Sequence, residues 1–234
     1  MSRITLALAA LLWLVFTPLV AQDFQKGLSA ALAGDYATAM QEWKPLAKQG
    51  DAFAQYNLGA MYYNGHGVPQ DNIEAVKWYR LAANQGNTRA QYNLGVMYDR
   101  GEGIPQDYTE ALKWYRLAAE NGYAAAQSNL GVMYDKGEGV PQDDAEAVKW
   151  YRLAAKQGNA AAQYNLGVMY QSGTGLLQDN VMAHMWYNIA SANGDEGAGE
   201  LRDKRAAVMT PSDISTAQAM ARECLSSSYK TCGY

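Results

Sequence analysis

A segment of 36 residues recurs four times in the middle of this 234-residue chain, and no other feature limits its possible folds as strongly. The hexapeptide Ala54–Gly59 returns three more times with one substitution. Each unit carries a tryptophan at the same position: Trp78, Trp114, Trp150 and Trp186. Self-similarity at such a period is the signature of a repeat architecture, in which each unit forms one supersecondary element.

Each unit predicts two helices. In its first half, Ala54, Leu58 and Met61 lie on one face of a helix, at spacings of four and seven residues. Glycines and a proline then end that helix, and Asp71 can cap the next one, with Glu74 placed as in a capping box. Because a single helix pair cannot bury its apolar face, the units must stack. The chain is therefore expected to be all-α, a solenoid of 36-residue antiparallel helix pairs.

Three strings carry a family resemblance: G-x-G-[VI]-P-Q-D, E-A-[VL]-K-W-Y-R-L-A-A and A-Q-x-N-L-G-x-M-Y. Over residues 50–194 the chain resembles the Sel-one-like repeat (SLR) family, relatives of tetratricopeptide repeats. The resemblance implies a right-handed superhelix used mainly for protein–protein contacts, often in the bacterial envelope. One branch of that family consists of secreted, cysteine-rich proteins reported to bind and hydrolyse β-lactams. This chain lacks the paired cysteines inside each repeat that mark that branch.

The first residues resemble an export signal. Residues 1–21 combine a charge at Arg3, an apolar stretch from Ile4 to Val20 and a small residue, Ala21, at a cleavable position. The alternative is an uncleaved membrane anchor, for which the stretch is a little short. We expect cleavage after Ala21, a periplasmic or secreted location, and no membrane span in the mature chain.

The segments that flank the repeats predict caps. Residues 22–49 form an incomplete opening unit of two capping helices, and residues 195–234 add capping helices and a tail. Thr210 and Pro211 open the last helix, which should run to about Cys224. Cys224 and Cys232 are the only cysteines, and an oxidising compartment favours a disulfide between them. Two free thiols or a redox-active pair are the alternative.

Composition argues against several kinds of site. The chain has 19 basic and 23 acidic residues, a net charge of −4, so broad binding of nucleic acid is not expected. With two histidines and two cysteines, a metal site has few ligands to draw on, and no cofactor is expected. Lys77 and Arg80 recur as a basic stripe, but glutamates three residues before each lysine can pair with it. His184 is expected to be an ordinary surface or cap-contact residue.

One short motif suggests catalysis. Ser227 and Lys230 match S-x-x-K, the nucleophile motif of serine β-lactamases, but the S-D-N and K-T-G motifs that accompany it are missing. The motif also lies in a tail rather than at the start of a core helix. We therefore expect no catalytic residues.

Partner binding is expected in the inner groove, on the first helix of each unit. Positions that vary between units while facing away from the stacking core include Phe53, Tyr63 and Arg89. Three tyrosines lie on one ladder of this face: Tyr56, Tyr92 and Tyr164. An aromatic groove with polar edges suits a partner peptide or helix, and packing between units is an equal alternative.

Four asparagines border the groove: Asn57, Asn93, Asn129 and Asn165. The resemblance to tetratricopeptide domains implies that these asparagines bind the backbone of a partner. Their recurrence in every unit favours a structural hydrogen bond instead.

The leading hypothesis is a non-enzymatic scaffold, adaptor or regulator in the bacterial envelope that binds another protein. The alternative is a hydrolase that acts on β-lactams or cell-wall fragments. Export beyond the periplasm to bind a host protein is a third hypothesis, and the sequence contains no secretion signal that separates it from the first.

Overall fold

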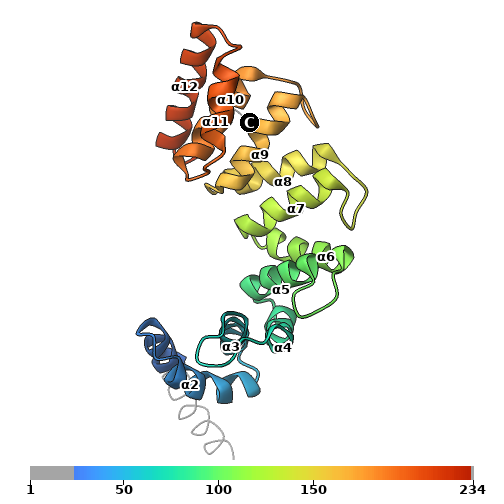
Figure 1. The fold of residues 1–234 in the computed structure, drawn as a ribbon, viewed down its shortest axis with the longest axis vertical. Coiled ribbons are helices and arrows are strands. Elements are labelled where there is room, and N and C mark those ends of the chain that lie inside the picture. Colours follow the sequence, from blue (N-terminus) through green and yellow to red (C-terminus); the bar gives the residue numbers. More distant parts are fainter. Residues whose placement is uncertain (1–23, 233–234) are drawn as a thin grey trace, which may run out of the picture. The chain divides into compact units, whose positions relative to one another are not determined.

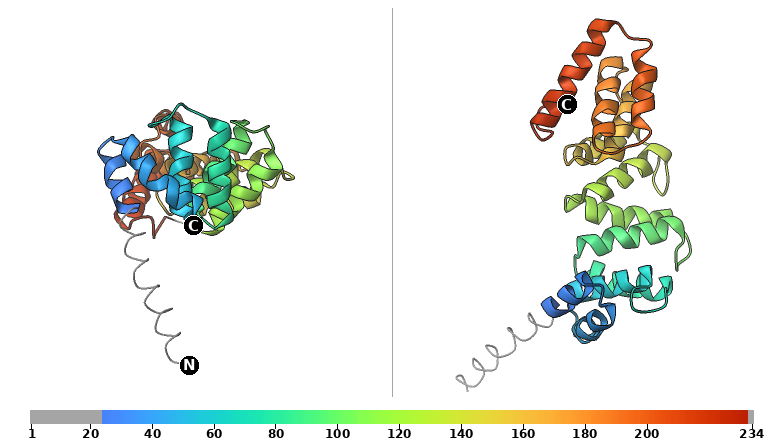
Figure 2. Two further views of the ribbon diagram at one scale, coloured as in Figure 1. Left: turned by 90° about the horizontal axis from the view of Figure 1, so that it is seen from below. Right: turned by 60° about the vertical axis from the view of Figure 1, so that its left-hand side comes forward.

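The computed structural model describes residues 24–232, so the signal peptide expected at residues 1–21 lies outside the described residues. The chain divides between Gln106 and Asp107 into two compact units. The described part contains helices and no strands (Figures 1 and 2). This confirms the predicted fold class, an all-α solenoid of antiparallel helix pairs.

Unit 1 begins with a helix over residues 24–32 and continues with four further helices. They are α2 (Tyr36–Lys48), α3 (Ala52–Asn64), α4 (Asn72–Asn84) and α5 (Thr88–Arg100). Unit 2 holds seven: α6 (Tyr108–Glu120), α7 (Ala124–Lys136), α8 (Asp144–Ala155), α9 (Ala160–Ser172), α10 (Asn180–Ala192), α11 (Ala198–Ala206) and α12 (Pro211–Ser226). Helices α3 and α4 pack as a pair in unit 1, as do α7 with α8 and α9 with α10 in unit 2.

Local sequence signals set the ends of these helices. The Asp71 carboxylate accepts a hydrogen bond from the Glu74 backbone N–H at 2.9 Å, as predicted for an N-cap. The Glu74 carboxylate pairs with Lys77 at 2.8 Å and forms no reciprocal bond to the cap, so only half of the expected capping box is present. Gly65 ends α3 with φ of 70°, a left-handed conformation that glycine adopts without steric cost.

Close approach between the helices of a pair requires the repeated glycine. A β-carbon at Gly59 would lie 2.6 Å from the Tyr79 ring, closer than packed atoms can come. Tyr79 is buried in that contact, together with Leu58. The hexapeptide motif thus ends in glycine because the aromatic side chain of the second helix occupies the space.

Polar side chains connect one pair to the next. The buried Gln163 amide donates to the Ala155 carbonyl at 3.1 Å, and its oxygen accepts from Asn193 at 2.7 Å. The Arg152 guanidinium donates to the Tyr170 hydroxyl at 3.1 Å. Because buried polar groups are costly when unpaired, these bonds explain why Gln and Arg recur in the motif.

The opening segment of unit 1 packs against the first repeat. Trp43 in α2 is buried, and its indole N–H donates to the Phe24 carbonyl at 3.2 Å. The adjoining cluster contains Leu46 and Leu58, so α2 covers one side of the first repeat. The segment leaves Leu32 largely exposed.

The closing segment covers α10, against which both α11 and α12 pack. Thr210 caps α12 and Pro211 occupies its first turn, as predicted, although the helix continues to Ser226, two residues beyond Cys224. Cys224 and Cys232 are joined in a disulfide. Among the described residues, none of the helices is both long and apolar enough to cross a membrane.

His184 takes one of its two expected roles. Its side chain is 2% exposed, so it is a buried cap-contact residue rather than a surface residue. The imidazole Nδ1 has no hydrogen-bond partner within the described residues. Burial, followed by the positive charge of Arg202 in α11, holds the pKa of His184 below its usual value.

Candidate functional site

The tail that contains the S-x-x-K motif is held by its own hydrogen bonds. The Ser227 hydroxyl donates to the Cys224 carbonyl at 2.9 Å and accepts from the Thr231 backbone N–H at 3.1 Å. These two hydrogen bonds of Ser227 therefore stabilise the disulfide-closed tail. Within residues 24–232, no cluster of His, Cys, Asp and Glu side chains could hold a metal ion.

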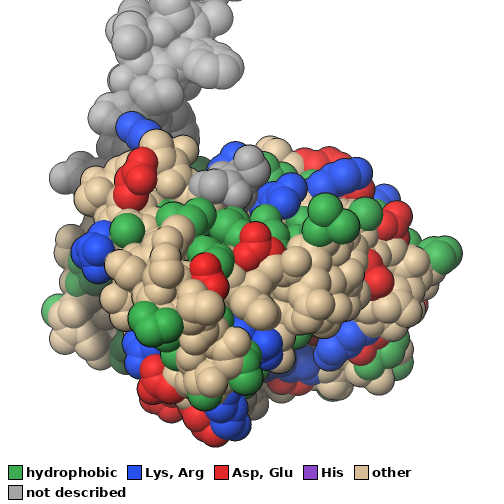
Figure 3. Space-filling model, turned by 90° about the horizontal axis from the view of Figure 1, so that it is seen from above, with side chains coloured by type: hydrophobic (Ala, Val, Ile, Leu, Met, Phe, Trp, Pro, Cys, Tyr) green, Lys and Arg blue, Asp and Glu red, His purple; other side chains and the backbone are tan. Residues whose placement is uncertain are grey.

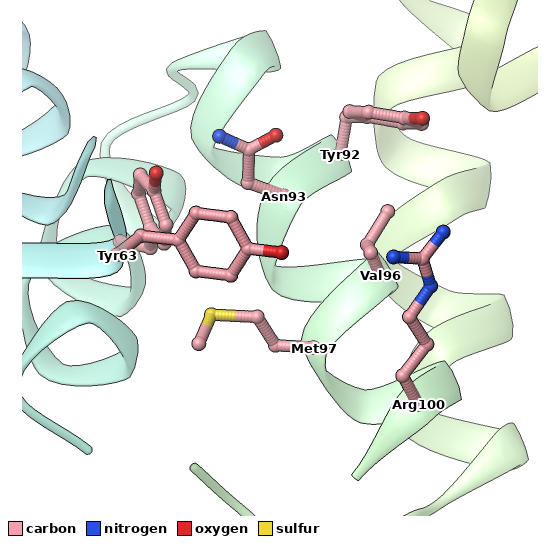
Figure 4. A pocket seen from close by; sticks show the side chains of 7 residues that line it. Tyr63, Tyr92, Asn93, Val96, Met97 and Arg100 are labelled. Atoms are coloured by element: carbon pink, nitrogen blue, oxygen red, sulfur yellow. The ribbon is translucent and has the colours of Figure 1, made fainter. Parts of the chain in front are cut away.

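A cavity of about 210 Å³ lies in unit 1 between α3 and α5, and we call it the tyrosine pocket. Tyr63 comes from α3, whereas Val96 comes from α5 (Figure 4). The remaining lining residues are Tyr79, Tyr92, Asn93, Met97 and Arg100. The pocket thus combines aromatic walls with one amide and one cation.

Hydrogen bonds orient the tyrosines of this pocket. The Tyr63 hydroxyl donates to the Glu102 carboxylate at 2.8 Å, and this bond, with burial, raises the pKa of Tyr63. Burial raises the pKa of Tyr79 above its usual value, and the neighbouring Asn93 side chain opposes part of that rise. Both phenols stay neutral at physiological pH, so the pocket offers polar but uncharged hydroxyls.

A second, larger cavity of about 610 Å³ lies at the start of α3 and α5, and we call it the aromatic hollow. Phe53 is 66% exposed and meets the Phe24 ring edge to face, with centroids 6.3 Å apart. Tyr56 and Leu28 add apolar surface, and Arg89 and Asn57 are polar residues of the lining. Exposed rings gathered around a hollow are typical of a surface that binds another molecule.

The three predicted tyrosines differ in their surroundings. Tyr56 lines the aromatic hollow and Tyr92 lines the tyrosine pocket, and both are half-buried. Tyr164 packs against the buried cluster of unit 2, with its ring close to Gly197 and 6.0 Å from the Tyr187 ring. All three are half-buried, and the rings of Tyr56 and Tyr79 lie 5.9 Å apart, as close as those of Tyr164 and Tyr187. The first two thus line cavities, whereas Tyr164 lies against the closing segment.

The four asparagines also differ. Asn57 lines the aromatic hollow and Asn93 lines the tyrosine pocket beside Tyr79. Within the described residues, the side chains of Asn57, Asn129 and Asn165 form no hydrogen bond. The recurrence of asparagine thus does not correspond to one hydrogen bond shared by all four units.

In unit 2 the residues equivalent to Tyr63 are Asp135 and Gln171, and each accepts a hydrogen bond from a tyrosine. The Tyr187 hydroxyl donates to the Gln171 side chain at 2.9 Å, and the Tyr151 hydroxyl to the Asp135 carboxylate at 3.5 Å. Burial raises the pKa of Tyr187 to about 12 and also raises that of Asp135. These bonds stay inside each helix pair, whereas in unit 1 Tyr63 turns to Glu102 and leaves space beside Tyr79.

Several lining residues were not predicted from the sequence. Phe24 and Leu28 come from the opening cap, whose packing on α3 has no repeat signature. Arg100 and Met97 belong to α5, where helical periodicity from Tyr92 and Asn93 could have located them.

The second helices carry the basic stripe on an exposed side. Lys77, Lys113 and Lys149 each pair with a glutamate three residues earlier, at 2.8, 3.3 and 2.6 Å. On the face shown in Figure 3, acidic and basic side chains are interspersed. The stripe is thus charge-balanced, as predicted, and such pairs contribute little to stability.

Comparison with known proteins identifies the repeat. The family model described as Sel1 repeat matches four consecutive segments, residues 52–87, 88–123, 124–159 and 160–195. The expected repeat region, residues 50–194, begins two residues earlier and ends one residue earlier. No curated protein matches the chain with significance.

Two solved structures are similar to the chain. A Sel1 repeat protein from Oxalobacter formigenes is 32% identical, with a TM-score of 0.76, and the match covers 91% of this chain and 92% of that one. A protective antigen present in uropathogenic Escherichia coli strains, displaying an SLR fold, is 46% identical with a TM-score of 0.66. That match covers 68% of this chain and 34% of the antigen, so the chain spans about a third of the antigen's length.

Proposed function

The chain belongs to the Sel1-repeat family, and from this premise we propose that it is a non-enzymatic interaction scaffold of the bacterial envelope. The family generally mediates protein–protein interaction. The chain would bind a partner protein or peptide segment on the first-helix face of its repeats. It would act as an adaptor or regulator rather than as a catalyst.

One observation carries this proposal: two cavities with aromatic walls open on the α3 and α5 face of unit 1. Tyr56, Tyr92, Asn57 and Asn93 line them. Fully buried aromatics would only stabilise the stack, but half-buried ones keep apolar area that a partner can cover. Aromatic anchors in such pockets supply most of the binding energy in many interfaces.

The envelope location rests on two sequence and structural features. Residues 1–21 have the pattern of a cleavable signal, and the Cys224–Cys232 disulfide suits an oxidising compartment. The exported chain should therefore begin near Gln22. Mass measurement of protein from the envelope fraction tests this, and a chain that still carries residues 1–21 would contradict it.

Partner capture tests the binding surface. The mature chain, residues 22–234, is immobilised as wild type, as Tyr56→Ala, as Tyr92→Ala and as the exposed control Lys77→Gln. We expect each tyrosine variant to lose about 1–2 kcal/mol of affinity for the retained protein, with a melting temperature close to that of wild type. The control should bind as the wild type does. If the tyrosine variants have much lower melting temperatures and their folded fraction binds with unchanged affinity, both residues only pack within the repeats.

A further inference from the structure

Helix α5 differs from the first helices of the other repeats in carrying an arginine at each end of its cavity-lining face. Arg89 lies at the start and Arg100 at the last residue of the helix. The positions equivalent to Arg89 are Phe53, Ala125 and Ala161. Those equivalent to Arg100 are Asn64, Lys136 and Ser172. Only the second repeat therefore carries cations at both places.

Arg89 is exposed on the lining of the aromatic hollow. Its guanidinium forms no ion pair or hydrogen bond within residues 24–232. Asn57, whose side chain also has no hydrogen bond there, lines the same hollow. The hollow thus offers a cation and an amide beside the exposed Phe53 ring.

Arg100 lines the tyrosine pocket, where it is 63% exposed. Its nearest carboxylate oxygen belongs to Glu102 at 3.6 Å, a long contact for an ion pair. The other oxygen of Glu102 accepts the Tyr63 hydroxyl at 2.8 Å. A carboxylate from a partner could therefore form a shorter, bidentate bond with this guanidinium.

The two cavities have the same charge character. Each is lined by one charged residue, Arg89 in the aromatic hollow and Arg100 in the tyrosine pocket, and neither is lined by a carboxylate. A ligand with acidic groups beside apolar ones would complement both cavities. Complementary charge of this kind sets specificity and the rate of association.

The helix fixes the spacing that such a ligand needs. Arg100 lies eleven positions after Arg89, and a rise of about 1.5 Å per residue places them about 16 Å apart along α5. An extended peptide rises about 3.3 Å per residue, so it covers that distance in about five residues.

We propose that unit 1 binds an extended, acidic segment of a partner protein along α5. Two carboxylates about five residues apart would contact Arg89 and Arg100, and neighbouring apolar side chains would enter the aromatic hollow and the tyrosine pocket. This inference rests on the proposed function and specifies the chemistry of the partner. Single-stranded nucleic acid could also stack on tyrosines, but two arginines are a small cationic surface for a phosphate backbone.

Synthetic peptides test the proposal with the mature chain. The first is a labelled peptide with two aspartates about five residues apart and a leucine or phenylalanine beside each. Three matched probes are a version with asparagine for aspartate, a version with the aspartates adjacent, and a short oligothymidylate. Fluorescence anisotropy is measured at low and high salt for the wild type, Arg89→Gln, Arg100→Gln and Lys136→Gln.

We expect the spaced acidic peptide to bind most tightly and to weaken with salt. Arg89→Gln and Arg100→Gln should each lower its affinity about threefold to tenfold, whereas Lys136→Gln, at the equivalent position of α7, should leave it unchanged. Both arginines are exposed, and circular dichroism would verify that the variants remain folded.

Three results would overturn the inference. The first is equal binding of the acidic and asparagine peptides. The second is an affinity for the acidic peptide that is the same in the wild type and in both arginine variants. The third is preferential binding of the oligothymidylate. A lack of binding by every probe would also contradict it. If neutral peptides bind and Tyr56→Ala or Tyr92→Ala abolishes that binding, the proposed function stands while the acidic partner fails.

Discussion

The two ends of the repeat array are covered to different extents by the segments that flank them. At the first repeat, the opening segment leaves the Phe53 ring exposed over a hollow. At the fourth repeat, α11 and α12 cover α10, so that Ile189 is fully buried, whereas Leu153, its counterpart one repeat earlier, is 44% exposed. Flanking segments without repeat signatures thus decide which repeat surfaces remain available.

Tyr56 and Tyr164 show the same contrast at a single repeat position. Tyr56 lines the aromatic hollow beside Leu28 of the opening segment. Tyr164 packs on the closing cluster near Gly197. Identical residues in identical motifs therefore have different neighbours, because the closing segment packs against one of them and a cavity lies beside the other.

The largest expected effect separates the covered and uncovered positions of the second helices. Ile189→Ala should lower the free energy of unfolding by about 2–5 kcal/mol, because it leaves a void under the closing helices. Leu153→Ala, at the equivalent exposed position, should cost about 0.5 kcal/mol. Urea titration followed by tryptophan fluorescence measures both. Equal losses for the two variants would remove the distinction between capped and open repeats.

Removing the disulfide should produce the next largest effect, confined to the closing end. The Tyr229 hydroxyl in the disulfide-closed tail donates to the Asn193 side chain at 2.9 Å, and its ring lies against Gly158. Opening the loop with Cys224→Ser and Cys232→Ser should cost about 2–3 kcal/mol through the entropy of the unfolded chain. Hydrogen exchange should then speed up in α12 and stay unchanged in α3. Equal protection of α12 with and without the bridge would show that the tail does not hold this cap.

The smallest effect is a pH dependence centred on His184. Burial and Arg202 lower its folded pKa, so the unfolded chain binds more protons as the pH falls below the ordinary histidine value of about 6.5. The stabilisation is complete above that value and is lost as the pH falls towards the folded pKa. Nearby Asp203 opposes part of the shift.

The test compares melting temperatures between mildly acidic and neutral pH for the wild type and His184→Asn. The wild type should lose more stability on acidification than the variant, because only the wild type must protonate a buried imidazole under α11. An identical pH dependence for both would assign the effect to other groups.

Much of the fold could be predicted from the sequence because local signals and the packing core agree. The Asp71 cap, the Gly65 terminator and the buried Tyr79 each follow from residues inside one repeat. The family resemblance was confirmed by four consecutive matches to the repeat. A motif that recurs unchanged indicates contacts that recur in every repeat, namely those between stacked helices.

The candidate site was less predictable, because it depends on contacts that do not recur. The sequence selected Tyr56, Tyr92 and Tyr164 together, yet only the surroundings of the caps distinguish them. His184 illustrates the same limit: its own helix has no signal that α11 covers it. Cap packing brings together segments far apart in the chain, and single-sequence periodicity does not encode such pairing.

Site-specific crosslinking tests whether the open face of unit 1 binds the partner. A photoreactive phenylalanine replaces Tyr56 in one variant and Leu153, an exposed residue of unit 2, in the other. Cells that export each variant are irradiated, and adducts are separated by mass. We expect a discrete protein adduct from position 56 and none from position 153. An adduct from position 153, with none from position 56, would contradict it.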